Sequence, residues 1–189
     1  MANVVVFCGS SSGISASHTA MAVELGSEIG RTGNGLVYGG GDVGLMGVVA
    51  DAVMRAGGPV TGVITERLAA LEVAHDGLTA LHVEESMHAR KARMAELGDG
   101  VVVLPGGFGT YEEVFEILTW NQLGLVSMPV TFLNVDGFYE PLLSFIAGAV
   151  DAGFLKPEHG ALASASTTAA DAVAIATQPA PAYTPKWVG

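Results

Sequence analysis

The sequence has 189 residues, half of them hydrophobic, and carries a formal net charge of −11 at neutral pH. That length suits one globular domain with a substantial core. The negative charge argues against a nucleic-acid polymer as partner, because proteins bind such polymers largely by neutralising their phosphates. No apolar stretch approaches the roughly 20 residues of a membrane span, the N-terminus lacks a secretory signal, and Cys8 is the single cysteine. We therefore expect no membrane partner and a cytoplasmic, reducing location.

Short apolar runs alternate with helical segments along the chain, and turn residues separate them. The expected strands are, in order, Asn3–Phe7, Leu36–Tyr38, Pro59–Ile64, Leu78–Val83, Val101–Leu104, Pro129–Leu133 and a last short one at Ala161–Ala163. The expected helices run from Ser15 or Ser17 to about Arg31, from the loop 39–47 to about Ala56, from Ser86 to Leu97, from Thr110 to about Leu123, from Gly137 to Ala152 and from Thr167 to about Thr177. Residues 65–77 are expected to form a loop with a helical turn.

This alternation predicts a single-domain α/β, Rossmann-like fold with a mainly parallel sheet and helices on both faces. We expect a nucleotide-binding domain over residues 1–178 and a proline-broken tail over residues 179–189 that lies on the surface or is disordered at its end. Three loops rich in glycine or serine, residues 8–13, 39–47 and 105–109, follow strands at the edge where such sheets bind ligands. Together the three loops predict a site the size of a nucleotide.

The loop 105–109 joins a buried strand to a helix that opens with acidic residues. Its glycines let backbone N–H groups approach a ligand, and the positive end of the helix suits a phosphate. Thr110 is the expected N-cap of that helix, and Glu113 has the spacing of a capping box. Glu112, Glu113 and Glu116 would repel a bound dianion, so at least one of them must face something else. A ribose that becomes cationic as its glycosidic bond breaks would be a suitable target, although the capping box alone also explains Glu113.

The second loop contains Gly39, Gly41 and Gly44 at the spacing of the dinucleotide fingerprint. It follows the second strand, whereas an NAD-dependent oxidoreductase carries this pattern after the first strand. The loop is therefore interpreted as either a nucleotide contact or a tight connection between strand and helix.

Three of the eight lysine and arginine residues lie between positions 90 and 93, within one predicted helix. At about 100° per residue, with Met87 at zero, Arg90 falls at about 300°. That position lies within the apolar face, between Leu97 at about 280° and Met94 at about 340°. A guanidinium that points inward needs an anionic partner, either a carboxylate or a ligand phosphate. Lys91 lies at the edge of the same face, and both interpretations stay open for it.

Metal and cofactor chemistry finds no support in the sequence. The five histidines have no ligand spacing, and a single cysteine gives no thiolate cluster. We expect no metal and no cofactor.

Four segments taken together resemble the LOG family of cytokinin-activating phosphoribohydrolases, whose members are often mislabelled lysine decarboxylases. These segments are CGSSSG at 8–13, YGGGDVGLMG at 38–47, MHARK at 87–91 and PGGFGTYEE at 105–113. The similarity extends from about Val4 to Ala163 and includes TWNQLG at 119–124. It implies hydrolysis of the N-glycosidic bond of an N6-substituted adenosine 5′-monophosphate, which releases the free base and ribose 5-phosphate.

The resemblance also implies roles for individual residues. Arg90 and Glu113 match the catalytic pair. The matching substrate contacts are Glu72, Lys91, Gly107, Phe108, Gly109, Thr110, Tyr111, Glu112 and Thr119, with Gly40 and Gly41 from the second glycine loop. The neighbours of Glu72 depart from the Pro-Arg-Glu-Ile that the family more often has. Family members are typically dimers, so a homodimer is implied.

Two other functions fit parts of the sequence. A non-catalytic nucleotide carrier, similar to molybdenum-cofactor carriers, would keep the glycine loops but would not need Glu113 as an acid. A lysine decarboxylase would need a pyridoxal phosphate Schiff base, for which Lys91 beside Arg90 is a poor candidate.

Overall fold

The computed structural model describes residues 1–71, 74–179 and 182–185. Seven strands in these residues form one sheet, in the spatial order β4-β3-β2-β1-β5-β6-β7, and every neighbouring pair is parallel. The strands are β1 (Asn3–Phe7), β2 (Gly35–Tyr38), β3 (Val60–Thr65), β4 (Ala80–Glu84), β5 (Gly100–Val103), β6 (Val130–Leu133) and β7 (Ser164–Ser166). The predicted α/β fold with a parallel sheet is confirmed.

Helices connect successive strands, as parallel pairing requires. They are α1 (Ala16–Arg31), α2 (Gly44–Arg55), α3 (Glu66–Ala69), α4 (Met87–Leu97), α5 (Phe108–Leu123), α6 (Glu140–Asp151), α7 (Pro157–Gly160) and α8 (Ala169–Ala176), with a 3-10 turn at Val135–Gly137. The described helices include none that is both long and apolar enough to cross a membrane.

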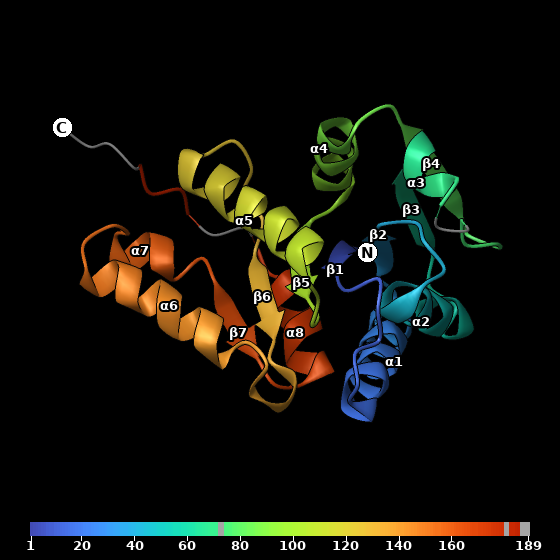
Figure 1. Cartoon of the computed structure of the whole chain (residues 1–189), viewed down its shortest axis with the longest axis horizontal. Helices are drawn as coiled ribbons and strands as arrows, with labels where there is room; N and C mark the ends of the chain where they lie inside the picture. Colours follow the sequence, from blue (N-terminus) through green and yellow to red (C-terminus); the bar gives the residue numbers. More distant parts are fainter. Residues whose placement is uncertain (72–73, 180–181, 186–189) are drawn as a thin grey trace.

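The side chains of β1 alternate between the two faces of the sheet, and both faces are buried. Val4 and Val6 pack with residues of α1, α2 and α8, whereas Val5 and Phe7 pack with residues of α4 and α5. Figure 1 shows α1 and α2 together on one side of the sheet and α4 and α5 on the other. The predicted covering of both faces is therefore confirmed.

Helices α1 and α2 approach each other closely because Gly26 has no side chain. A Cβ atom on Gly26 would lie 2.5 Å from the Val49 carbonyl oxygen. The close contact lets both helices pack against the same face of the sheet.

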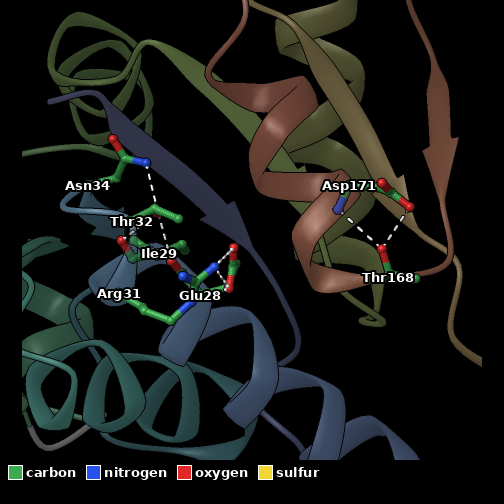
Figure 2. A network of polar contacts seen from close by, with 7 residues as sticks. All are labelled: Glu28, Ile29, Arg31, Thr32, Asn34, Thr168 and Asp171. Carbon is green, nitrogen blue, oxygen red and sulfur yellow. Dashed lines mark hydrogen bonds and ion pairs between the residues drawn. The ribbon is translucent and has the colours of Figure 1, made fainter.

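Hydrogen bonds from side chains occur at the end of α1 and at the start of α8 (Figure 2). At the end of α1, Thr32 Oγ1 donates to the Glu28 carbonyl at 2.7 Å, and Arg31 pairs with the Glu28 carboxylate. At the start of α8, Thr168 Oγ1 accepts from the Asp171 N–H at 3.1 Å. Ser15 caps α1, one of the two predicted choices. The predicted cap at Thr167 is wrong by one residue, because Thr168 makes the reciprocal contacts with Asp171.

The segment before β7 differs from the prediction. Residues 161–163, expected as a strand, lead out of α7, and the strand begins at Ser164. Pro157 occupies the first turn of α7, where a missing backbone N–H costs nothing. The strand starts later than predicted because the residues before Ser164 form α7 and the turn that follows it.

Part of the predicted tail lies against the body of the protein. A Cβ atom on Gly124, at the end of α5, would lie 2.8 Å from the Tyr183 ring. Thr184 O and His159 Nε2 are 3.1 Å apart. Residues 180–181 and 186–189 of the predicted tail lie outside the described residues.

Candidate active site

The order of the strands places the site between β1 and β5. The chain leaves β1 toward β2 on one side of the sheet and leaves β5 toward β6 on the other. Such a switch point opens a crevice at the carboxyl ends of the two strands. There the Gly9 N–H donates to Pro105 O at 3.0 Å, and the Leu45 N–H donates to Gly9 O at 3.1 Å. The three predicted loops therefore meet at one edge, as expected.

A cavity of about 300 Å³ occupies this crevice, within the range of small-molecule sites. Its lining residues are Val6, Phe7, Cys8, Gly9, Ser10, Gly39, Met46, Leu68, Met87, Arg90, Met94, Gly107, Phe108, Gly109, Thr110 and Glu113. Six of them are predicted site residues: Arg90, Gly107, Phe108, Gly109, Thr110 and Glu113.

Arg90 points inward from α4, as the helical angle predicts, and only 5% of it is exposed. Its Nε donates to Val63 O at 2.8 Å, and its Nη2 donates to Gly39 O at 3.2 Å. The guanidinium occupies the space where a side chain at Gly39 would lie, so a Cβ atom there would overlap Nη2. Two backbone carbonyls thus fix the orientation of Arg90, and its Nη1 donates to Met87 Sδ at 3.7 Å.

Glu113 on α5 meets Arg90 in the cavity wall. Its Oε1 lies 3.7 Å from Arg90 Nη1, and 9% of the residue is exposed. The two side chains thus form a buried ion-pair contact in the lining of the cavity. The anionic partner expected for Arg90 is therefore a carboxylate that itself lines the cavity.

The capping-box interpretation of Glu113 is wrong. Helix α5 begins at Phe108, its N-cap is Gly107, and no side chain caps it. Thr110 lies inside the first turn, where its Oγ1 lies so close to Gly106 that a Cβ atom there would overlap it. Gly106 and Gly107 allow the chain to start the helix earlier than Thr110, the predicted N-cap, would indicate.

The N-terminus of α5 faces the cavity. Gly107, Phe108, Gly109 and Thr110 line it, and the first N–H groups of a helix have no partner within the helix. A Cβ atom on Gly107 or Gly109 would meet nothing within 4 Å, so open space lies beside both. Backbone donors and the helix dipole make this end of the cavity suitable for an anion.

Cys8 and three methionines form parts of the lining that the sequence interpretation missed. Burial, with a further contribution from Glu113, raises the pKa of the Cys8 thiol far above its ordinary value, so the thiol stays neutral and is a weak nucleophile. Met46, Met87 and Met94 supply apolar surface. Met46 also packs into the core, so it belongs both to the core and to the wall of the cavity.

Lys91 lies outside this lining, between α4 and α5. Only 3% of it is exposed, and its Nζ pairs with Glu112 and lies 2.9 Å from Glu116 Oε2. Burial alone would lower the pKa of Lys91, but the two carboxylates raise it overall. Lys91 and Glu112, both expected as substrate contacts, are therefore paired with each other.

Gly40, Gly41, Tyr111 and Thr119 are likewise not among the described lining residues of the cavity. Gly40 and Gly41 contact the segment at 74–75 through backbone hydrogen bonding. Thr119 donates to Phe115 O at 2.7 Å and borders a separate cavity of about 130 Å³ beside α6. The predicted contact Glu72 lies outside the described residues.

A second cavity of about 300 Å³ adjoins the first and shares Gly9, Ser10 and Gly107 with it. Residues 11–13, His18 and Phe138 form its remaining wall together with Leu45, Pro105 and Gly106.

Among the described residues, no group of three or more histidine, cysteine, aspartate or glutamate side chains could hold a metal ion.

Fold and site together define an α/β protein whose ligand-sized cavity lies at the switch point of a parallel sheet and is walled by a buried arginine–glutamate pair. The family described as possible lysine decarboxylase matches residues 46–176. A cytokinin riboside 5′-monophosphate phosphoribohydrolase of Rhodococcoides fascians is 51% identical over 82% of this chain and 79% of its own length. The LOG enzyme of that name from Oryza sativa subsp. japonica is 44% identical over 95% of this chain and 74% of its own. The chain belongs to the LOG family, as its motifs predict.

A solved structure with the same fold is the molybdenum cofactor carrier protein of Chlamydomonas reinhardtii. It has a TM-score of 0.68, covers 92% of this chain and 94% of its own, and is 24% identical. At that identity the likeness shows the fold alone.

Proposed function

We propose that this chain hydrolyses the N-glycosidic bond of N6-substituted adenosine 5′-monophosphates and releases the free base and ribose 5-phosphate. The names of relatives at 51% and 44% identity support the reaction. The observation that carries the proposal is the buried pair of Arg90 and Glu113, which lines a cavity beside a helix N-terminus. That arrangement combines a place for a phosphate with a carboxylate for a sugar that becomes cationic.

The 5′-phosphate is assigned to the N-terminus of α5. Backbone N–H groups of the turn at 107–110 donate to it, and the helix dipole favours its charge. The open space beside Gly107 and Gly109 supports this assignment, because a phosphate must approach the backbone directly. The apolar wall of Met46, Met87 and Met94 then receives the purine, since methionine sulfur packs well against aromatic rings.

Glu113 acts at the anomeric carbon in this proposal. As the C1′–N9 bond breaks, its electron pair leaves with the base, and the ribose develops positive charge that a nearby carboxylate stabilises. A water oxygen then forms the new bond to C1′ and gives up a proton, and the base gains one. Glu113 also orients that water. Arg90 orients the phosphate or assists departure of the base.

The protein is further proposed to act as a homodimer in the cytoplasm. Large apolar side chains on α4 and α5 are exposed, among them Met87, Phe115 and Phe108, the last at 92%. Because Met87 and Phe108 also line the cavity, a second copy packed on these helices would close its mouth. Light scattering coupled to size-exclusion chromatography tests this, with twice the mass of the chain as the expected result.

Product analysis tests the activity directly. The pure protein is incubated with AMP and with N6-isopentenyl-AMP, and free base and ribose 5-phosphate are quantified. Equal amounts of the two products are expected, and Arg90→Ala should reduce the rate at least roughly 100-fold, a typical loss for a positioned catalytic group. Glu96→Gln, at an exposed position of α4, is the control and should keep the rate. Tight binding with no product would contradict hydrolysis and favour a nucleotide carrier.

A further inference from the structure

The connection between β3 and β4, residues 66–79, supplies one wall of the cavity through Leu68. Its near end is fixed by Thr65, whose Oγ1 accepts from the Leu68 N–H at 3.3 Å. Its far end rests on the second glycine loop, where Ala74 forms a bridge with Gly41 and the His75 N–H donates to Gly40 O at 3.2 Å. This wall is therefore held at two points, and the second involves His75.

The His75 imidazole connects three parts of the chain. Its Nδ1 lies 2.7 Å from Asp76 O, and its Nε2 lies 3.2 Å from Asp51 Oδ1 on α2 and 3.6 Å from Asp42 Oδ1. Only 8% of the side chain is exposed. Carbonyl and ionised carboxylate oxygens only accept hydrogen bonds, so both ring nitrogens face acceptors. The ring is shielded while the Asp42 and Asp51 carboxylates are about half exposed, and its contacts link the segment at 74–76 to α2 and to the second glycine loop.

The loop that holds His75 also holds the catalytic arginine. Gly39 O accepts from Arg90 Nη2, while Gly40, the next residue, has a φ of +77° and accepts from His75. Movement of the segment at 74–76 would therefore disturb the cavity wall first. Arg90 would be disturbed less, because Val63 O on β3 also accepts from it.

We propose that His75 is a positioning residue for the proposed reaction. Together with Asp51 and Asp42 it fixes the segment at 74–76 on the glycine loop, and it thereby restrains the connection that carries the wall at Leu68, against which the substrate binds. The expected effect on kinetics rests on the proposed function. The restraint of the segment at 74–76 by the contacts of His75, called the His75 clamp below, does not depend on that function.

The kinetic test compares His75→Ala with His75→Gln, whose terminal amide retains a donor near the position of Nε2. His75→Ala should raise KM for AMP about tenfold and change kcat less than about threefold, the effect of losing a hydrogen bond to a charged group. His75→Gln should recover most of the affinity. His82→Ala, which replaces a half-buried histidine on β4, is the matched control and should leave both constants unchanged. A fall in kcat with KM unchanged would mean only fewer folded molecules, and it would overturn the proposal.

Hydrogen exchange and calorimetry separate this inference from the proposed function. Backbone amides in residues 66–71 and 74–79 should exchange faster in His75→Ala than in wild type, and AMP should bind about tenfold more weakly. If the wild type releases no base but these two shifts occur, the clamp stands and the proposed function fails. If exchange and AMP affinity are the same in wild type and His75→Ala, the clamp is refuted, whatever the catalytic activity.

Discussion

At the scale of single residues, the site depends on how one guanidinium is held. Arg90 Nε donates to Val63 O and Nη2 donates to Gly39 O, while Nη1 lies 3.7 Å from Glu113 Oε1. The contacts come from β3, the second glycine loop and α5, so three separate parts of the chain position the arginine. Misplacement of a catalytic group by a fraction of its normal contact distance lowers rates strongly.

Gly39→Ala tests this arrangement without changing any charge. The new methyl group would overlap Arg90 Nη2 and lie 3.0 Å from Met46 Sδ, so the guanidinium must move. We expect kcat/KM for base release to fall about 10- to 100-fold. Gly148→Ala on α6 is the matched control, because its Cβ atom would meet nothing within 4 Å. Equal activity of the Gly39 and Gly148 variants would show that the carbonyl contacts do not position Arg90.

At the scale of elements, two neighbouring ion pairs join α4 to α5. Arg90 meets Glu113 in the cavity wall, and the next residue, Lys91, meets Glu112 and Glu116 outside it. The two pairs therefore fix the relative position of the helices that carry the catalytic candidates. Lys91 is better explained as part of this connection than as a phosphate contact.

Lys91→Met separates these two roles. Loss of the connection should reduce kcat about tenfold and lower the Tm, because two carboxylates lose their buried partner, while KM for AMP changes little. Lys91→Arg, which keeps the charge, should retain most of the rate. The contrary result is a large rise in KM with kcat unchanged, since that pattern indicates a lost binding contact.

The local signals of capping predicted some elements well and others poorly. Helix α4 begins after Ser86 and ends before Gly98, as expected. Serine is a strong N-cap, glycine ends helices readily, and no other good capping residue lies close to Ser86. The start of α5 was misplaced, since Thr110 is a good cap but Gly107 allows an earlier start. The inward direction of Arg90 followed from helical periodicity. The partners of Lys91 and the methionine wall could not be predicted, because both depend on which elements become neighbours.

At the scale of the whole molecule, strand order creates the site. Alternating strands and helices predict a parallel sheet, but they do not say that β1 lies between β2 and β5. That order brings the loops 8–13 and 105–109 together at one switch point.

Truncation after residue 178 tests the predicted domain boundary. Tyr183 and Thr184 contact Gly124 and His159, at the far end of α5 from Glu113. Loss of these contacts should cost about 1 kcal/mol and lower the Tm by a few degrees, with the rate of base release unchanged within about twofold. A truncated chain that fails to fold would place the tail inside the domain, and full-length protein melted in parallel is the reference.

The most direct test of the account is the rate of base release by Glu113→Gln, measured together with its affinity for AMP. The amide keeps the shape of the side chain and removes the charge that would stabilise the ribose cation. We expect a loss of at least roughly 100-fold in kcat, with AMP still bound and the fold intact by circular dichroism. A variant that releases base at the rate of the wild type would contradict it.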